Sequence, residues 1–134
     1  METKGYILLV DDEPAARSAL AELLRYEGYR VETAGSAEEA LAHTSRDRPD
    51  IVLTDLRMPG IGGLELLQRM READPRASIV VMTAYAAFDS IVAAMKAGAV
   101  DYLLKPVDIA ELIPLLEREI LKRRVTVPPS AGGG

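Results

Sequence analysis

Five short apolar runs, separated from one another by helix-like segments, constrain the fold of this chain more than any other feature. The runs cover residues 6–10, 30–34, 50–54, 78–83 and 100–104. Such alternation is typical of a parallel sheet whose strands are connected by helices. The first, third and fourth runs are continuously apolar, as in strands covered on both faces, whereas residues 30–34 alternate like an edge strand. The sequence therefore predicts an α/β fold with a five-stranded parallel sheet.

Local signals mark the first two helices between these strands. The first helix is expected to begin at Pro14, which suits a first helical position, and to stop at Gly28. The second is expected to open with a capping box formed by Ser36 and Glu39. In such a box each side chain accepts a hydrogen bond from the backbone N–H of the other residue.

The remaining helices are expected over residues 63–73, over residues 87–97 and from Asp108 onward. The last of them carries apolar residues on one face and ends in the basic cluster Lys122-Arg123-Arg124, which complements the helix dipole. Pro114 lies inside this helix and removes a backbone donor. We therefore expect a kink or a late start there.

Length and composition bound the class of protein. A chain of 134 residues is the size of one domain, and its formal charge of −5 argues against direct binding to nucleic acid or to an anionic membrane. It has no cysteine and no apolar run long enough for a signal peptide or a membrane span, so a cytoplasmic protein is expected. Residues 1–123 are predicted to form the domain. Residues 124–134, rich in proline and glycine, are predicted to form a linker or disordered tail leading to an absent output domain.

Ionisable and hydroxyl side chains collect where the predicted strands end. The carboxyl ends of parallel strands meet at one edge of a sheet, around a crevice. The candidates at this edge are Asp11, Asp12, Glu13, Asp55, Thr83 and Lys105. Converging carboxylates repel one another unless a cation lies among them, and hard oxygen ligands suit Mg²⁺. A metal, a lysine and a hydroxyl around one carboxylate are an arrangement for phosphoryl transfer, in which the carboxylate can be the nucleophile.

Over about residues 6–122, the chain resembles the receiver domain of two-component response regulators. The motifs that carry the resemblance are Asp55-Leu56-Arg57-Met58-Pro59-Gly60, Asp11-Asp12, Thr83-Ala84, Gly98-Ala99 and Lys105-Pro106. Each motif is weak by itself, but their common order and spacing are specific. The resemblance implies a doubly wound, flavodoxin-like sheet with strand order 2-1-3-4-5 and five helices.

The resemblance also implies a phosphorylation site with a bound metal. Asp55 would be the phosphoacceptor and would receive its phosphoryl group from a sensor histidine kinase. Asp11, Asp12 and Asp55 would hold Mg²⁺, helped by the backbone carbonyl of Arg57. Arg57 and Tyr85 occupy positions that tune the loss of the phosphoryl group in this family.

The same resemblance implies a switch. Thr83 would bind the phosphoryl group, and Lys105 would pair with it beside a cis peptide bond to Pro106. Tyr102 matches the switch aromatic, whose ring turns inward when Thr83 is drawn to the phosphoryl group. The movement would alter the surface of the fourth helix, fifth strand and fifth helix, through which a homodimer is also expected.

The stretches 82–86 and 97–106 look most like the receivers of sigma-54-dependent transcriptional activators. The AAA+ and DNA-binding domains of such proteins would lie outside this chain, which has no phosphate-binding loop and no basic recognition helix. We therefore expect no ATPase activity and no direct nucleic-acid binding. The chain would perform only phosphotransfer to itself and autodephosphorylation. Gly62 and Pro114 depart from the family pattern, which often has Asp or Asn at the first of these positions.

Other classes share parts of this pattern. A dinucleotide-binding enzyme needs glycines directly after the first strand, and none lies between Gly5 and Gly28. An FMN protein would need a hydroxyl-rich phosphate loop there, and an aspartate-nucleophile phosphatase would resemble Asp-x-Asp. The alternative that stays open is a degenerate receiver that binds proteins without phosphorylation. His43, the only histidine, is expected to be an exposed residue and neither a ligand nor a phosphodonor.

Overall fold

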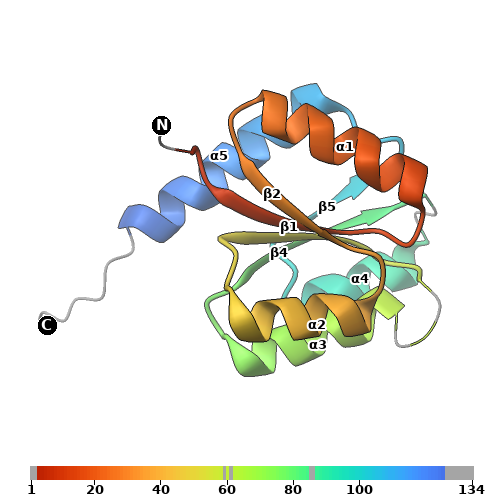
Figure 1. The fold of residues 1–134 in the computed structure, drawn as a ribbon. Helices are drawn as coiled ribbons and strands as arrows, with labels where there is room; N and C mark the ends of the chain where they lie inside the picture. Colours follow the sequence, from red (N-terminus) through yellow and green to blue (C-terminus); the bar gives the residue numbers. More distant parts are fainter. Residues whose placement is uncertain (1–2, 59, 61, 85–86, 126–134) are drawn as a thin grey trace, which may run out of the picture.

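The computed structural model describes residues 3–58, 60, 62–84 and 87–125 of the chain. Strands and helices alternate along it (Figure 1). The strands are β1 (Tyr6–Val10), β2 (Arg30–Ala34), β3 (Ile51–Asp55), β4 (Ser78–Thr83) and β5 (Asp101–Leu104). The helices are α1 (Pro14–Tyr26), α2 (Ala37–Arg46), α3 (Gly62–Ala73), α4 (Phe88–Lys96) and α5 (Ile109–Val125). Within the described residues the strands form one parallel sheet of order β2-β1-β3-β4-β5, as predicted.

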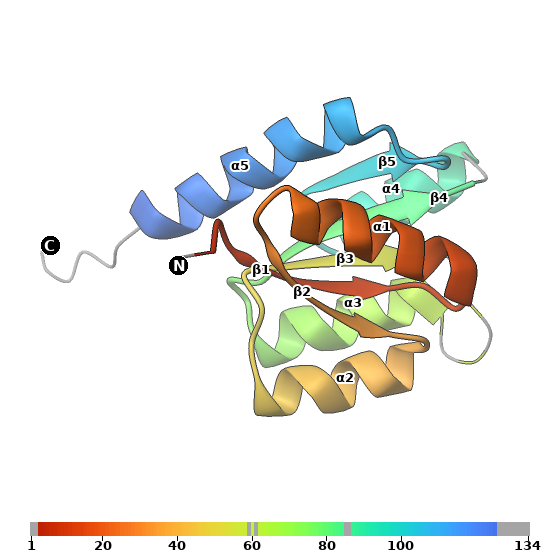
Figure 2. The ribbon, with the colours of Figure 1, turned by 45° about the horizontal axis from the view of Figure 1, so that its top comes forward.

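The sheet is the middle of three layers. Helices α1 and α5 cover one face, and α2, α3 and α4 cover the other (Figure 2). Alternate residues of a strand point to opposite faces, so β1 contributes Ile7 and Leu9 to the core under α1 and α5. Leu8 and Val10 enter the second core, under α2 and α3. The two cores explain why the central strands are continuously apolar.

The register of the sheet aligns the carboxyl ends of its central strands. Val10 pairs with Thr54, Asp55 with Met82, and Thr83 with Leu104. The residues that end or follow these strands therefore meet at one edge. Strand β2 lies at the outside of the sheet, as its alternating pattern predicts, and Arg30 at its start is exposed.

At the start of α2 only one of the two hydrogen bonds of the predicted capping box is present. The Ser36 hydroxyl accepts a 3.0 Å hydrogen bond from the backbone N–H of Glu39, as expected. The Glu39 carboxylate accepts from the N–H of Gly35 at 2.8 Å instead of from that of Ser36. Ser36 is extended (φ −155°, ψ 165°), and the N–H that faces the carboxylate is that of the preceding residue.

Helix α5 begins without delay despite its proline. The Asp108 carboxylate accepts a hydrogen bond from the N–H of Ala110, and α5 starts at Ile109, so the expectation of a late start is wrong. The helix then runs through Pro114 and continues to Val125 (Figure 2). Near its end Arg123 donates to the backbone carbonyl of Arg76 at 2.7 Å. The tail is predicted to begin at residue 124, but α5 includes residues 124 and 125. The rest of the predicted tail, residues 126–134, lies outside the described residues.

Among the described helices, none has the length and apolar character that crossing a membrane requires.

Candidate functional site

Three carboxylates converge at the carboxyl edge of the sheet. Asp11 and Asp12 follow β1, and Asp55 ends β3. Oxygen atoms from all three lie within 4.8 Å of one another. Asp11 and Asp55 are buried and Asp12 is exposed, so the cluster is open to solvent on one side. Three negative charges this close attract a cation strongly.

Backbone hydrogen bonds hold the two loops that carry these carboxylates. The N–H of Asp11 donates to the carbonyl of Ala34 at 3.1 Å, which ties the loop after β1 to β2. The Asp11 carboxylate accepts from the N–H of Glu13 at 3.0 Å. In the second loop the N–H of Arg57 donates to Asp55 at 3.2 Å. These bonds fix the side-chain directions of the buried carboxylates.

Lys105 reaches the cluster from the end of β5. Its Nζ lies 2.8 Å from Asp11 Oδ2 and 3.1 Å from Asp55 Oδ2. The predicted cis peptide bond between Lys105 and Pro106 is present. Burial lowers the pKa of Lys105, but the hydrogen bonds to Asp11 and Asp55 and the charges of these groups outweigh it, so the pKa is raised. The lysine is therefore a positive charge at neutral pH.

Thr83 and Tyr102 occupy different depths near this edge. Thr83 is fully buried at the end of β4, and its carbonyl accepts from the N–H of Lys105 at 2.8 Å. Tyr102 on β5 keeps 38% of its surface exposed and lines a depression of about 630 Å³ shared with α5. Neither Lys105 nor any of the three clustered carboxylates lines this depression. Tyr85, the second predicted tuning residue, is outside the described residues.

The sequence did not single out two residues that contact the site. Arg17 on α1 donates from Nη1 to the backbone carbonyl of Asp11 at 2.8 Å. The available signal was a basic residue one helical turn after the acidic pair, which is too common to single out. Gly63 is a second such residue: a Cβ added there would lie 2.3 Å from the carbonyl oxygen of Asp55.

The expectation that His43 is exposed is wrong. The residue lies on α2, but it is half-buried, and its Nε2 is 2.5 Å from the Tyr6 hydroxyl. Tyr6 begins β1, whereas Asp11 follows the end of that strand. His43 therefore lies at the opposite edge of the sheet from the acidic cluster.

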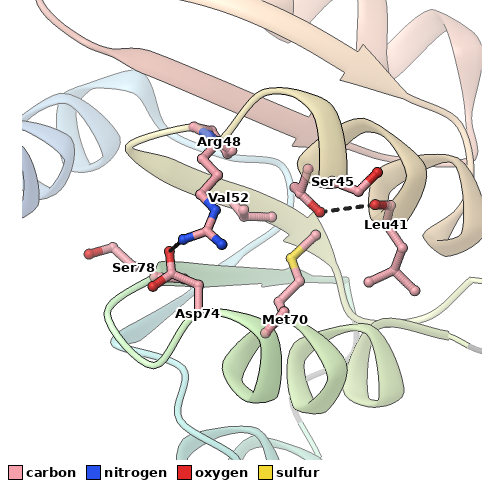
Figure 3. A pocket seen from close by; sticks show the side chains of 11 residues that line it. Leu41, Ser45, Arg48, Val52, Met70, Asp74 and Ser78 are labelled. Carbon is pink, nitrogen blue, oxygen red and sulfur yellow. Dashed lines mark hydrogen bonds and ion pairs between the residues drawn. The ribbon is translucent and has the colours of Figure 1, made fainter.

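A separate pocket of about 350 Å³ lies at that opposite edge, between α2 and α3 (Figure 3). Arg48 and Asp74 face each other across it at 3.9 Å. The Thr44 hydroxyl donates to the carbonyl of Leu41 at 3.1 Å, so this donor is already used within α2. The pocket contains none of the site residues that the sequence predicts.

The doubly wound α/β fold, with an acidic cluster, a lysine and a threonine at the carboxyl edge of the sheet, is that of a CheY-like signalling domain; a CheY-like receiver domain protein from Methanospirillum hungatei has this fold with a TM-score of 0.85 and 31% identity, over 89% of this chain and 95% of that chain. Residues 7–117 match the model of the response regulator receiver domain. The chain belongs to this family, and the predicted fold and family are both confirmed.

Known relatives agree with this assignment. The DNA-binding transcriptional regulator NtrC of Salmonella typhimurium is 38% identical over 117 residues, which are 87% of this chain and 25% of that protein. The sporulation initiation phosphotransferase F of Bacillus subtilis is 39% identical over 106 residues, covering 79% of this chain and 86% of that protein. NtrC is in line with the resemblance to receivers of sigma-54-dependent activators. The chain spans a quarter to half of the first curated relatives it matches.

Among solved structures, the response regulator TrrA of Thermotoga maritima was crystallised in complex with Mg²⁺ and BeF. It is 38% identical to this chain with a TM-score of 0.78, over 85% of this chain and 97% of the TrrA chain.

Proposed function

We propose that this domain is a phosphorylation-activated switch, in which Asp55 accepts a phosphoryl group with the help of Mg²⁺. The observation that carries the proposal is the convergence of three carboxylates and the Lys105 ammonium group on one edge of the sheet. Asp11, Asp12 and Asp55 fit Mg²⁺ because they offer several hard oxygen ligands on one open side. The carbonyl of Arg57, two residues after Asp55, would complete this set. The Mg²⁺ bound in the TrrA complex supports the choice of metal.

The chemistry is a transfer between two nucleophiles. A carboxylate oxygen of Asp55 forms a bond to phosphorus, while the bond from phosphorus to a histidine nitrogen of the donor breaks and its electron pair returns to the imidazole. Bound Mg²⁺ would neutralise charge on the phosphoryl oxygens. Lys105, already 3.1 Å from Asp55, would pair with one of these oxygens, and the Thr83 hydroxyl would donate a hydrogen bond to another.

The donor is expected outside these 134 residues. His43 is the only histidine and lies at the opposite edge of the sheet, bonded to Tyr6. A groove of about 460 Å³, bordered by α1 and by Pro106 and Val107, opens beside Asp11 and Lys105. Leu23 of α1 lines it and is half exposed. This apolar surface next to the acidic cluster is where a sensor histidine kinase would approach.

The output of the switch would be transmitted by α4, β5 and α5. Large apolar side chains are exposed on this face, among them Phe88 on α4 and Leu104 on β5. Inward rotation of Tyr102 would change the same face, through which a homodimer would form. Residues 1–123 would act as the receiver and residues 124–134 as the connection to AAA+ and DNA-binding domains of a cytoplasmic transcriptional regulator.

Intact mass after incubation with acetyl phosphate and Mg²⁺ tests the proposal. We expect a single phosphoryl adduct that is absent from the Asp55→Asn variant and absent in EDTA. Asp74→Asn, which changes a carboxylate at the opposite edge of the sheet, should still be modified. The absence of an adduct, together with no binding of Mg²⁺, would support the degenerate receiver that acts by protein binding alone.

A further inference from the structure

Arg17 connects α1 to the loop that carries two of the three carboxylates. It lies one turn into the helix, and its own N–H donates to the carbonyl of Glu13 at 2.9 Å. Its guanidinium turns back over the loop and donates from Nη1 to the carbonyl of Asp11 at 2.8 Å. The side chain is half-buried, so its position is restricted by its neighbours.

Gly35, in the loop between β2 and α2, provides the space for this guanidinium. A Cβ added to Gly35 would lie 2.9 Å from Arg17 Nη1 and 3.6 Å from its Cζ. The two peptide units that flank Asp11 are thus each held by a hydrogen bond: the N–H of the unit before it donates to Ala34, and the carbonyl of the unit after it accepts from Arg17. The backbone between β1 and α1 cannot rotate there without breaking one of these bonds.

We propose that Arg17 is a positioning residue for the metal site, which it serves by fixing the peptide between Asp11 and Asp12. The peptide unit is planar, so fixing the carbonyl of Asp11 also fixes the direction in which the chain enters Asp12. Asp12 is the exposed member of the cluster, so the direction of its main chain is expected to decide where its carboxylate points. This role rests on the proposed function, because it concerns the same Mg²⁺ site.

The direction in which Mg²⁺ affinity changes when Arg17 is removed distinguishes a positioning role from a purely electrostatic one. A guanidinium near the carboxylates repels Mg²⁺, so a residue that acted only through its charge would weaken metal binding, and its removal would tighten it. A positioning residue has the opposite effect, because its removal lets the ligands leave their productive geometry. Groups that orient metal ligands typically change metal affinity by roughly 10- to 100-fold when they are mutated.

Two variants disturb the contact in different ways. Arg17→Met removes the donor and the charge but keeps an apolar stem. Gly35→Ala keeps Arg17 and its charge, and its new Cβ displaces the guanidinium from the Asp11 carbonyl; Gly35 has no positive φ, so alanine causes no backbone strain. Arg25→Met is the matched control. Arg25 also lies on α1 and donates to a backbone carbonyl, that of Val31, at 2.7 Å.

The experiment is a titration of each protein with MgCl₂, followed by NMR of the backbone amides of Leu56 and Arg57, which lie outside the altered loop. We expect the Mg²⁺ dissociation constant to rise about 10-fold in Arg17→Met and in Gly35→Ala, and to stay unchanged in Arg25→Met. In Arg17→Met and Gly35→Ala, adduct formation with acetyl phosphate should be slower than in the wild type at low Mg²⁺ and should reach the wild-type rate at saturating Mg²⁺.

Thermal unfolding in EDTA distinguishes this role from a structural one. Arg17→Met and Arg25→Met should lose similar amounts of stability, because each loses one arginine-to-carbonyl hydrogen bond. Unchanged Mg²⁺ affinity in both site variants would overturn the proposal, as would tighter binding by Arg17→Met. Failure of the wild-type protein to bind Mg²⁺ would overturn the proposed function and this role together.

Discussion

Lys105 Nζ lies 2.8 Å from Asp11 Oδ2, and the two side chains keep only 22% and 4% of their surfaces exposed. Water screens so enclosed a pair weakly. The lysine is therefore a fixed positive charge against the same carboxylate that is proposed to bind Mg²⁺. Two cations that share one carboxylate compete for it.

Replacement of Lys105 by Met should accordingly tighten Mg²⁺ binding several-fold and reduce the yield of the phosphoryl adduct. In EDTA the variant should be less stable by roughly 1–3 kcal/mol, because buried Asp11 loses its partner. Saturating Mg²⁺ should restore most of this loss. Urea unfolding with and without Mg²⁺ measures both effects, with Lys96→Met, an exposed lysine on α4, as the control. Equal Mg²⁺ affinity in the variant and the wild type would contradict the competition.

Gly63→Ala should damage the site through the backbone. Its Cβ would lie 2.3 Å from the Asp55 carbonyl oxygen and 2.7 Å from the Cα of Leu56, and neither backbone atom can move freely. We expect a loss of about 1–3 kcal/mol in the free energy of unfolding and slower phosphorylation at saturating Mg²⁺.

Gly62→Asn is the control for that variant. Gly62 has a φ of +73° and nothing within 4 Å of its added Cβ, and asparagine tolerates this conformation. Its stability and its rate of phosphorylation should stay close to those of the wild type. Phosphorylation of Gly63→Ala at the wild-type rate would show that the close contact does not position Asp55.

Phosphorylation should reduce the exposure of Tyr102, which is 38% in this structure. If Thr83 couples the phosphoryl group to the tyrosine, then Thr83→Ala should still form the adduct while its Tyr102 ring stays exposed. Nitration of Tyr102 by tetranitromethane, located by peptide mass spectrometry, measures the ring's accessibility. Tyr26, which is 87% exposed on α1, is an internal reference. Equal protection of Tyr102 in both phosphorylated proteins would remove Thr83 from the coupling.

Alkaline pH should destabilise the domain through Tyr6. Burial and then the charge of Asp47 raise the pKa of Tyr6 from 10.0 to about 12, although Arg30 partly opposes them. A pKa that is higher in the folded than in the unfolded state leaves stability intact below pH 10 and lowers it as the pH rises toward 12. Tyr6→Phe should lack this part of the decline. Urea unfolding across this range measures it, and parallel pH profiles of the two proteins would refute it.

The contacts of His43 and Glu119 could not be predicted from the sequence. His43 on α2 contacts Tyr6, which is 37 positions earlier, and Glu119 on α5 lies buried 3.4 Å from the Ser78 hydroxyl, 41 positions earlier. Neither residue is distinctive in the local sequence. Their environments depend on how helices pack across the sheet, and that packing joins residues whose separation carries no periodic signal.

The sequence by itself determined the alternation of strands and helices, the edge position of residues 30–34 and the collection of Asp11, Asp55, Thr83 and Lys105 at one edge. These features can be predicted locally, because a few consecutive residues are enough to indicate which faces of a strand are buried and where the strand ends. Only the tertiary structure decided that Lys105 bonds Asp11, that Glu39 accepts from Gly35, and that Arg17 holds the Asp11 carbonyl. Lys105 and Asp11 are 94 positions apart, so the packing of the whole domain sets their distance. The other two contacts span only four and six positions, and they depend on how each loop bends where it enters its helix.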